Sequence, residues 1–185
     1  MPELPHRVDR IVLIGFMGAG KTTVGQLLAA RLAWRFLDLD RSIEAKTGLS
    51  VAQIFAEQGE ETFRRLEQQL TAELASAERT VLAPGGGWPL RDENVRALPP
   101  GSAVLWLRVS ATEAVRRLSR AGQPRPLLMQ ADPLERAVEL EAQRAGRYAE
   151  IGWPIETEQR EPVEVANEIL RILGDRVQTH EPASN

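Results

Sequence analysis

Residues 15–22 read Gly-Phe-Met-Gly-Ala-Gly-Lys-Thr, a full match to the pattern G-x-x-x-x-G-K-[ST]. The run before this stretch, Arg10-Ile-Val-Leu-Ile14, is short, apolar and rich in β-branched side chains. After the motif, residues 22–34 are rich in Leu, Ala and Gln, as helices are. A chance match in a glycine-rich turn would not explain the strand, the helix and the Lys-Thr pair together. The stretch therefore predicts a phosphate-binding loop in an α/β protein.

Each part of this loop suits a nucleoside triphosphate. Glycines let backbone N–H groups close around phosphate oxygens, and the helix N-terminus adds the positive end of its dipole. Lys21 can reach the β- and γ-phosphates, and the Thr22 hydroxyl can ligate Mg²⁺. Lys21 is one of only two lysines in the chain, so composition does not explain its place. The predicted nucleotide-binding residues of the loop are Gly18, Ala19, Gly20, Lys21, Thr22 and Thr23.

Length and composition limit the class of protein. A chain of 185 residues with 43% hydrophobic and 26% charged residues fits one globular domain, which we place at residues 1–174, followed by a polar tail at 175–185. The net charge of −3 gives no reason to expect a nucleic-acid partner. No apolar run approaches the ~20 residues that cross a bilayer. The chain has no cysteine, which excludes disulfides and thiolate metal sites. We expect a cytoplasmic monomer.

Strand-like and helix-like segments alternate along the chain, which is typical of a parallel α/β sheet. Ser50 and Gln53 form a capping-box pattern at a helix start, and an apolar stripe through Phe63 and Leu66 marks the next helix. The predicted strands are residues 8–14, 35–37, 80–83, 103–108 and 153–156. The predicted helices are residues 22–34, 51–58, 60–76, 112–120, 133–150 and 162–173.

Two further segments are expected beyond the C-terminal ends of the strands, where open parallel sheets bind ligands. Asp38 and Asp40 follow a strand, and alternation would point both carboxylates into one cleft, one toward Mg²⁺ and one toward a reacting hydroxyl. Alternatively, Asp40 is a helix N-cap. The glycines at 85–87 offer backbone amides to a ligand, or they form a flexible turn.

The arginines leave similar alternatives. Arg64 and Arg65 lie in a predicted helix, and Arg144 lies near the end of another, positions that are ordinarily solvated. Arg125 lies between two prolines, and this stiff loop suits an arginine that closes over a transferred phosphate. The chain has no Asn-Lys-x-Asp segment and no Asp-x-x-Gly switch, which argues against a GTPase. A small kinase remains.

Taken together, these segments resemble the shikimate kinase family over residues 8–173. The resemblance rests on the phosphate-binding loop, Asp38-Leu-Asp40, Phe63-Arg64-Arg65-Leu66-Glu67 and Gly85-Gly86-Gly87, continuing through Arg125-Pro126-Leu127-Leu128 and Arg144 with Tyr148. It implies a three-layer P-loop fold with a five-stranded parallel sheet in the order 2-3-1-4-5. It also implies a substrate-binding subregion at about residues 40–70 and a mobile lid at about 120–131.

The resemblance further implies phosphoryl transfer from ATP, with Mg²⁺, to the 3-hydroxyl of shikimate in aromatic amino acid biosynthesis. It implies that Asp40 binds the shikimate hydroxyls and acts as base. For the acceptor, it implies that Arg64 and Arg144 pair with the substrate carboxylate and that Gly86 and Gly87 give backbone contacts. For the nucleotide, it implies that Arg125 meets the phosphates, that Asp38 lies near Mg²⁺ with Thr22, and that Arg117 and Pro162 flank the adenine. Lys21, Asp40 and Arg125 would form the catalytic set.

The chain departs from the family pattern at three places. Ala83-Pro84 stands where a hydroxylic residue is usual, bulky Trp88 follows the glycines, and Gly146 replaces a proline. Trp88 leaves open a related kinase that acts on another hydroxy acid, such as gluconate. A non-catalytic nucleotide-binding module is the third hypothesis, which the presence of Lys21 and Asp40 argues against.

Overall fold

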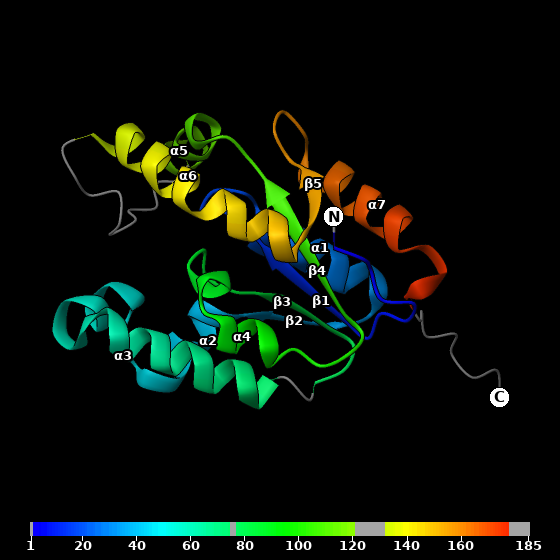
Figure 1. The fold of residues 1–185 in the computed structure, drawn as a ribbon, viewed down its shortest axis with the longest axis horizontal. Helices are drawn as coiled ribbons and strands as arrows, with labels where there is room; N and C mark the ends of the chain where they lie inside the picture. The colour runs from blue at the N-terminus through cyan, green and yellow to red at the C-terminus, as the bar shows by residue number, and fades with distance from the viewer. Residues whose placement is uncertain (1, 75–76, 121–131, 178–185) are drawn as a thin grey trace.

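A computed structural model describes residues 2–74, 77–120 and 132–177 of the chain (Figure 1). Strands and helices alternate along it as the sequence predicts. The strands are β1 (Arg10–Ile14), β2 (Arg35–Asp38), β3 (Thr80–Ala83), β4 (Ser102–Arg108) and β5 (Trp153–Glu156). The helices are α1 (Lys21–Leu32), α2 (Leu39–Thr47), α3 (Val51–Leu74), α4 (Asp92–Arg96), α5 (Ala111–Arg120), α6 (Pro133–Ile151) and α7 (Pro162–Leu173), with short 3₁₀ turns η1 (Trp88–Leu90) and η3 (Gly174–Arg176).

The five strands form one sheet in the order β2-β3-β1-β4-β5, and every neighbouring pair is parallel. The predicted fold is therefore confirmed. β1 lies at the centre, where Arg10 is in register with Thr80 of β3 and Ser102 of β4. All five residues of β1 are buried, which explains the continuous apolar run from Ile11 to Ile14.

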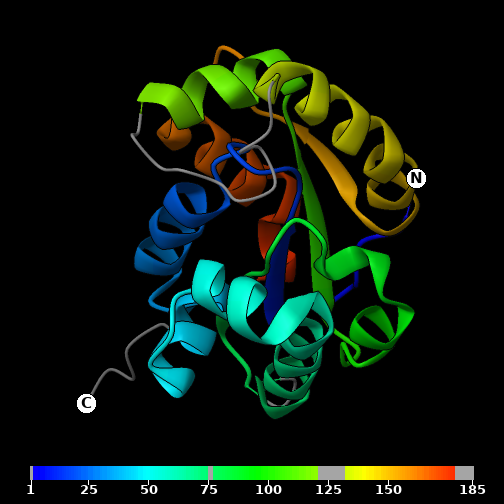
Figure 2. The same ribbon diagram turned by 90° about the vertical axis from the view of Figure 1, so that its left-hand side faces the viewer.

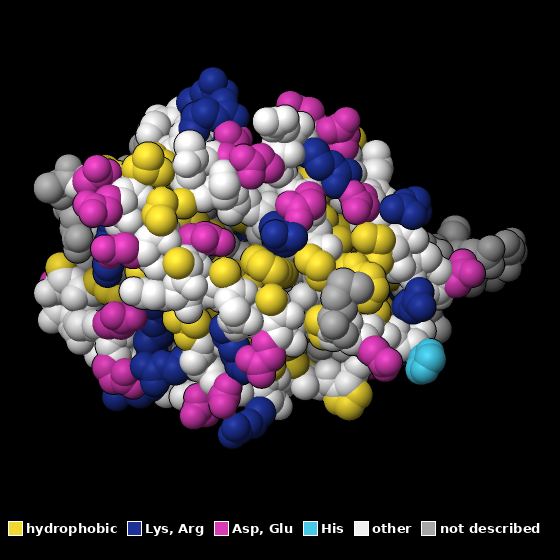
Figure 3. Space-filling view, turned by 45° about the horizontal axis from the view of Figure 1, so that its top comes forward, with side chains coloured by type: hydrophobic (Ala, Val, Ile, Leu, Met, Phe, Trp, Pro, Cys, Tyr) yellow, Lys and Arg dark blue, Asp and Glu magenta, His cyan; other side chains and the backbone are white. Residues whose placement is uncertain are grey.

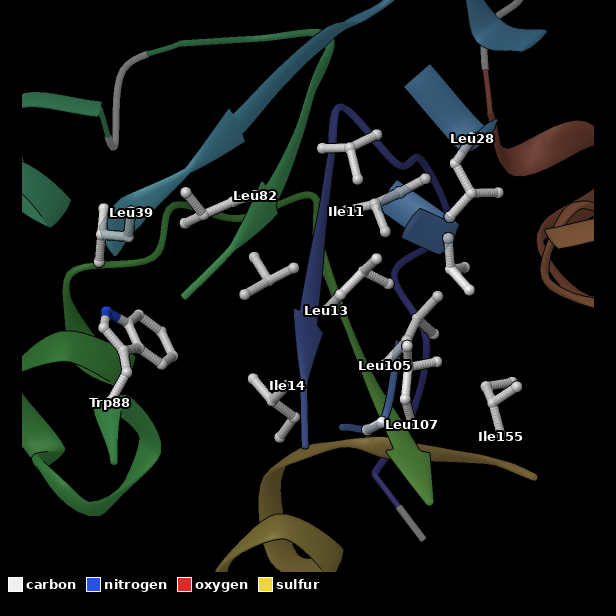
Figure 4. Close-up of a cluster of buried hydrophobic side chains, with 14 of the residues drawn as sticks. Ile11, Leu13, Ile14, Leu28, Leu39, Leu82, Trp88, Leu105, Leu107 and Ile155 are labelled. Atoms are coloured by element: carbon white, nitrogen blue, oxygen red, sulfur yellow. The ribbon is translucent and has the colours of Figure 1, made fainter. Parts of the chain in front are cut away.

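Helices cover both faces of the sheet, so the molecule has three layers (Figure 2). Helices α1 and α7 pack together on one face, and α6 and α4 lie on the other. The core joins these layers through fully buried side chains such as Ile11, Leu13, Leu105 and Trp88 (Figure 4). No helix among the described residues is long and apolar enough to cross a membrane. The face in Figure 3 mixes acidic and basic side chains rather than gathering one sign.

The local differences from the predicted elements have clear causes. Helix α2 was not among the predicted helices and was anticipated only by the alternative of a cap at Asp40; it begins after Asp38, whose Oδ1 accepts a hydrogen bond from the Arg41 backbone N–H at 3.3 Å. The N-cap is thus Asp38, and the alternative of Asp40 as a cap is wrong. The capping box at Ser50 and Gln53 is present in both directions, at 2.9 and 3.2 Å.

Helix α3 joins two predicted helices across Gly59, which has φ 82° and ψ 164° and breaks the helical path. The first predicted strand is shorter than expected, because Val8 forms only an isolated bridge to Val177 and regular pairing begins at Arg10. η1 and α4, which follow the glycines, were also not predicted.

Candidate active site

One pocket of about 990 Å³ lies at the C-terminal edge of the sheet and is lined by segments from both halves of the chain. The phosphate-binding loop, the residues after β2 and the glycine segment (residues 85–87) meet there, as expected for a parallel sheet. Arg125 lies outside the described residues. The predicted site residues that line the pocket are Gly18, Ala19, Gly20, Lys21, Thr22, Thr23, Asp38, Asp40, Gly86, Arg117 and Pro162.

The phosphate-binding loop is held by contacts that only glycine permits. Gly18 has φ +76°, and a Cβ added there would lie 2.8 Å from the Ala114 carbonyl oxygen of α5. Gly20 also has a positive φ and precedes the first residue of α1, and no side chain caps that helix end. The first N–H groups of α1 therefore remain available to an anion in the pocket.

The two polar side chains at the start of α1 are positioned by specific hydrogen bonds. The Lys21 ammonium donates to the carbonyl oxygens of Gly15 at 2.8 Å and Phe16 at 3.0 Å. The Thr22 hydroxyl donates to Asp38 Oδ2 at 2.8 Å. A hydroxyl and a carboxylate at this spacing are the hard oxygen donors that Mg²⁺ prefers, so these residues fit the metal that accompanies a nucleotide.

Asp38 and Asp40 both line the pocket, but not because of strand alternation. Asp38 ends β2, whereas Asp40 lies in the first turn of α2. A Cβ on Gly85 would lie 3.1 Å from Asp40 Oδ1 and 3.1 Å from Glu67 Oε1, so the two carboxyl groups flank this glycine. Both carboxylates therefore lie at one pocket as expected, but the predicted reason, alternation along a strand, was wrong.

Arg64 is buried rather than solvated, whereas its neighbour Arg65 is exposed. Its guanidinium pairs with Glu67 at 2.9 Å and with Glu60 at 2.9 Å, and a Cβ on Gly87 would lie only 2.4 Å from Nη2. Burial lowers the pKa of Arg64, but the two acidic partners outweigh it and raise the pKa overall. Arg64 therefore presents a fixed positive charge beside the glycine segment.

Glu67 belongs to a segment on which the family resemblance rests, but the sequence analysis gave it no role in the site. Its side chain is fully buried, and burial raises its pKa to about 7. The charge and hydrogen bond of Arg64 pull the pKa down, and Asp40 pushes it up. The signal that could have identified it is the spacing of three residues from Arg64, which places both on one face of a helix.

Arg144 and Tyr148 approach the glycine segment from α6. Both are buried, contrary to the ordinary expectation for charged or polar residues near a helix end. The Tyr148 hydroxyl donates to the Gly86 carbonyl oxygen at 2.6 Å, and a Cβ on Gly86 would lie 3.3 Å from Arg144 Nη1. Burial raises the pKa of Tyr148 to about 12, so the phenol stays protonated and keeps donating.

The α5 side of the pocket is organised around Arg117. Its guanidinium donates to Glu113 at 2.8 Å, to the Thr157 carbonyl at 2.6 Å and to the Gly18 carbonyl at 3.3 Å. The hydrogen bond from Arg116, and to a smaller extent the one from Arg117, lowers the pKa of Glu113 to about 2. These contacts occupy the edges of the guanidinium, a cation whose flat face suits stacking on an aromatic base. Glu113, like Glu67, was not predicted, although its spacing of four residues from Arg117 is a recognisable signal.

Trp88 does not enter the pocket, although it follows the glycines directly. Its side chain is fully buried, and its indole N–H donates to the Thr71 hydroxyl at 2.9 Å. Gly146, at another departure from the family pattern, has no atom within 4 Å of an added Cβ. Neither residue obstructs the pocket.

Asp38, Asp40 and Arg117 line the pocket, and Arg64 and Arg144 pack against Gly87 and Gly86 at its edge. This arrangement, with a phosphate-binding loop on a 2-3-1-4-5 parallel sheet, defines a P-loop phosphotransferase. The family model described as shikimate kinase matches residues 17–174. The chain belongs to the shikimate kinase family and is an ATP-dependent kinase. The alternatives of a gluconate-type kinase and of a non-catalytic module are not favoured.

Individual relatives agree with this assignment. The chain is 46% identical to a shikimate kinase of Moorella thermoacetica over 88% of this chain and 93% of the relative. It is 45% identical to a shikimate kinase of Pseudomonas syringae pv. tomato over 89% and 96%. A solved shikimate kinase from Acinetobacter baumannii, in complex with shikimate, has a TM-score of 0.84 at 37% identity and covers 90% of this chain and 93% of that one. A gluconokinase from Sinorhizobium meliloti 1021, at 21% identity and a TM-score of 0.56, shares the fold alone.

Proposed function

We propose that this enzyme transfers the γ-phosphoryl group of ATP to the 3-hydroxyl of shikimate and releases ADP. The hydroxyl oxygen forms a bond to the γ-phosphorus while the bond to the β,γ-bridging oxygen breaks, and Asp40 takes the hydroxyl proton. The observation that carries this proposal is the approach of Arg64 and Arg144 to adjacent glycines, 87 and 86, beside Asp40. Two arginines suit a carboxylate, and an aspartate suits neighbouring hydroxyls.

In this proposal the remaining site residues bind different parts of the nucleotide. Lys21 and the N–H groups at the start of α1 hold the phosphates, while Arg117 and Pro162 flank the base. Thr22 and Asp38 would hold Mg²⁺, which when bound neutralises charge on the phosphates. We further propose that Arg125 belongs to the lid at residues 120–131 and meets the transferred phosphate.

We also propose that the active unit is a monomer. ATP as phosphoryl donor supports a cytoplasmic location. Shikimate use places the enzyme in aromatic amino acid biosynthesis, as the family assignment supports.

A coupled assay of ADP release tests the proposal. Purified protein with MgATP is compared with shikimate, quinate, gluconate or no acceptor. Shikimate-dependent ADP release well above the other three is expected. Release with gluconate or quinate alone would show that the acceptor has been assigned wrongly, and ATP binding without release on any acceptor would contradict the catalytic assignment.

A further inference from the structure

Trp88 is fully buried but is tied to the residues around the acceptor side of the pocket. It directly follows the glycine segment and begins η1. Its indole lies in the buried cluster that also contains Leu39 and Leu82 (Figure 4). Its position therefore connects the core with the segment that Arg64 and Arg144 approach.

The indole N–H is linked to α3 by two consecutive hydrogen bonds. Trp88 Nε1 donates to Thr71 Oγ1 at 2.9 Å, and Thr71 Oγ1 donates to the Glu67 carbonyl oxygen at 2.7 Å. The hydroxyl thus serves as acceptor and as donor, and Thr71 is itself buried. Glu67 is the ion-pair partner of Arg64, so the connection ends in the helical turn that carries the arginine.

The backbone of Trp88 fixes the glycines at the same time. Its N–H donates to the Gly85 carbonyl at 3.0 Å and closes a turn over the segment, and its carbonyl accepts from Asn94 Nδ2 at 3.1 Å. Glycines have no side chains to hold their own conformation, so an external anchor determines where they lie. With this anchor in place, Gly87 fits directly against the Arg64 guanidinium.

We propose that Trp88 is a positioning residue that holds the glycine segment against the Arg64 turn of α3 and so shapes the carboxylate-binding part of the acceptor site. The inference rests on the proposed function, because it assigns this part of the pocket to the acceptor. It separates Trp88 from the nucleotide residues, because the described hydrogen bond of the indole runs to Thr71 in α3 and not to the phosphate-binding loop or Arg117.

A second buried tryptophan provides a matched control. Trp34 is 8% exposed and lies between α1 and β2, and its Nε1 is buried without a hydrogen-bond partner among the described residues. Trp34→Phe removes a buried indole but no hydrogen bond. Trp88→Phe removes the bond to Thr71, and Thr71→Val removes the same bond from the other side. The comparison separates loss of packing from loss of the anchor.

The test measures KM for shikimate, KM for ATP and kcat in the three variants. Trp88→Phe and Thr71→Val should each raise KM for shikimate about fivefold, with KM for ATP unchanged, because one buried hydrogen bond is lost. The double variant should be no worse than the single ones, since both remove the same bond. Trp34→Phe should leave both KM values unchanged.

Hydrogen exchange of the Gly86 and Gly87 amides gives a second readout that needs no substrate. Exchange should become faster in Trp88→Phe and Thr71→Val and not in Trp34→Phe. Equal rises in both KM values, the same effect in Trp34→Phe, or unchanged amide exchange would each overturn the inference. A wild-type enzyme that ignores shikimate would instead contradict the proposed function, and the exchange data alone would then decide whether Trp88 anchors the segment. Thr71→Val keeps the test possible if Trp88→Phe does not fold.

Discussion

Arg64 and Glu67 form a buried ion pair of 2.9 Å within α3, one helical turn apart. The Glu67 side chain is fully buried and that of Arg64 is 9% exposed, so the pair is almost removed from water. A buried charge of this kind needs a partner, and Glu67 supplies one from the same helix. The pair therefore holds the arginine beside Gly87 before any acceptor binds, and the proposed acceptor site is formed in advance.

We predict that Arg64→Ala weakens shikimate binding and leaves ATP binding nearly unchanged. A hydrogen bond to a charged group is worth about 2 kcal/mol, so Kd for shikimate should rise roughly thirtyfold. Calorimetric titration with each ligand measures both effects. Arg65→Ala is the control, because Arg65 is the exposed neighbour on the same helix. Equal losses for both ligands would contradict the assignment of Arg64 to the acceptor.

Glu67 should make the stability of the protein depend on pH. The pKa of this carboxyl is about 7 in the folded protein, because burial outweighs the attraction of Arg64, against 4.5 without the fold. Between these pH values the folded state binds more protons than the unfolded state. The free energy of unfolding therefore falls as pH rises from about 4.5 to about 7, and this contribution is constant above and below that window.

Glu67→Gln removes this titration and should flatten that part of the profile. Urea unfolding at pH 5 and pH 7.5 measures the effect. The wild type should lose at least about 1 kcal/mol more than the variant between these two conditions, since each pKa unit corresponds to about 1.4 kcal/mol. Parallel profiles for the two proteins would show that Glu67 titrates at its ordinary pKa.

Glu113 should matter for the nucleotide and not for the acceptor. Its carboxylate holds Arg117 at 2.8 Å, and Arg117 in turn contacts the Gly18 carbonyl of the phosphate-binding loop. Glu113→Gln should raise KM for ATP about fivefold, because the ion pair with Arg117 is replaced by a weaker hydrogen bond to a neutral amide oxygen, while KM for shikimate stays constant.

The control for Glu113 is Glu139→Gln in α6. Glu139 pairs with Arg136 at 2.9 Å within α6, at a spacing of three residues and with its carboxylate exposed. This variant should match the wild type in both KM values. A Glu113→Gln enzyme whose KM for shikimate rises as much as its KM for ATP would disprove the separation of the two halves of the pocket.

The fold could be predicted largely from local patterns. The phosphate-binding loop requires a strand before it and a helix after it, and alternation of apolar segments predicts a parallel sheet. Alternation does not determine the strand order, which came from the resemblance to the family. Helix α2 was anticipated only by the alternative of an N-cap at Asp40. Its N-cap is instead Asp38, a residue that the sequence analysis assigned to the site and whose carboxylate accepts the Thr22 hydroxyl.

The site was less accessible to sequence reasoning, because burial depends on the tertiary fold. Arg64, Arg144 and Tyr148 have the composition of a solvated helix surface, yet the glycine segment packs against them and removes them from water. The sequence position of Trp88, directly after the glycines, suggested that its bulky side chain lies beside the acceptor. Its hydrogen bond to Thr71 instead directs the ring into the core. Such orientations follow from long-range contacts that no local spacing encodes.

Lys21→Ala should separate catalysis from acceptor binding. The Lys21 ammonium is held at the loop by the Gly15 and Phe16 carbonyls, from which it can turn to the phosphates of bound ATP. Removing it should lower kcat at least about a hundredfold, because phosphoryl transfer depends on neutralising charge on the phosphates. Calorimetry should show shikimate binding close to that of the wild type. Lys46→Ala removes the other lysine of the chain, which lies in an exposed ion pair with Glu73, and should leave kcat unchanged. A Lys21→Ala enzyme that turns over near the wild-type rate would show that the loop does not act on the transferred phosphate.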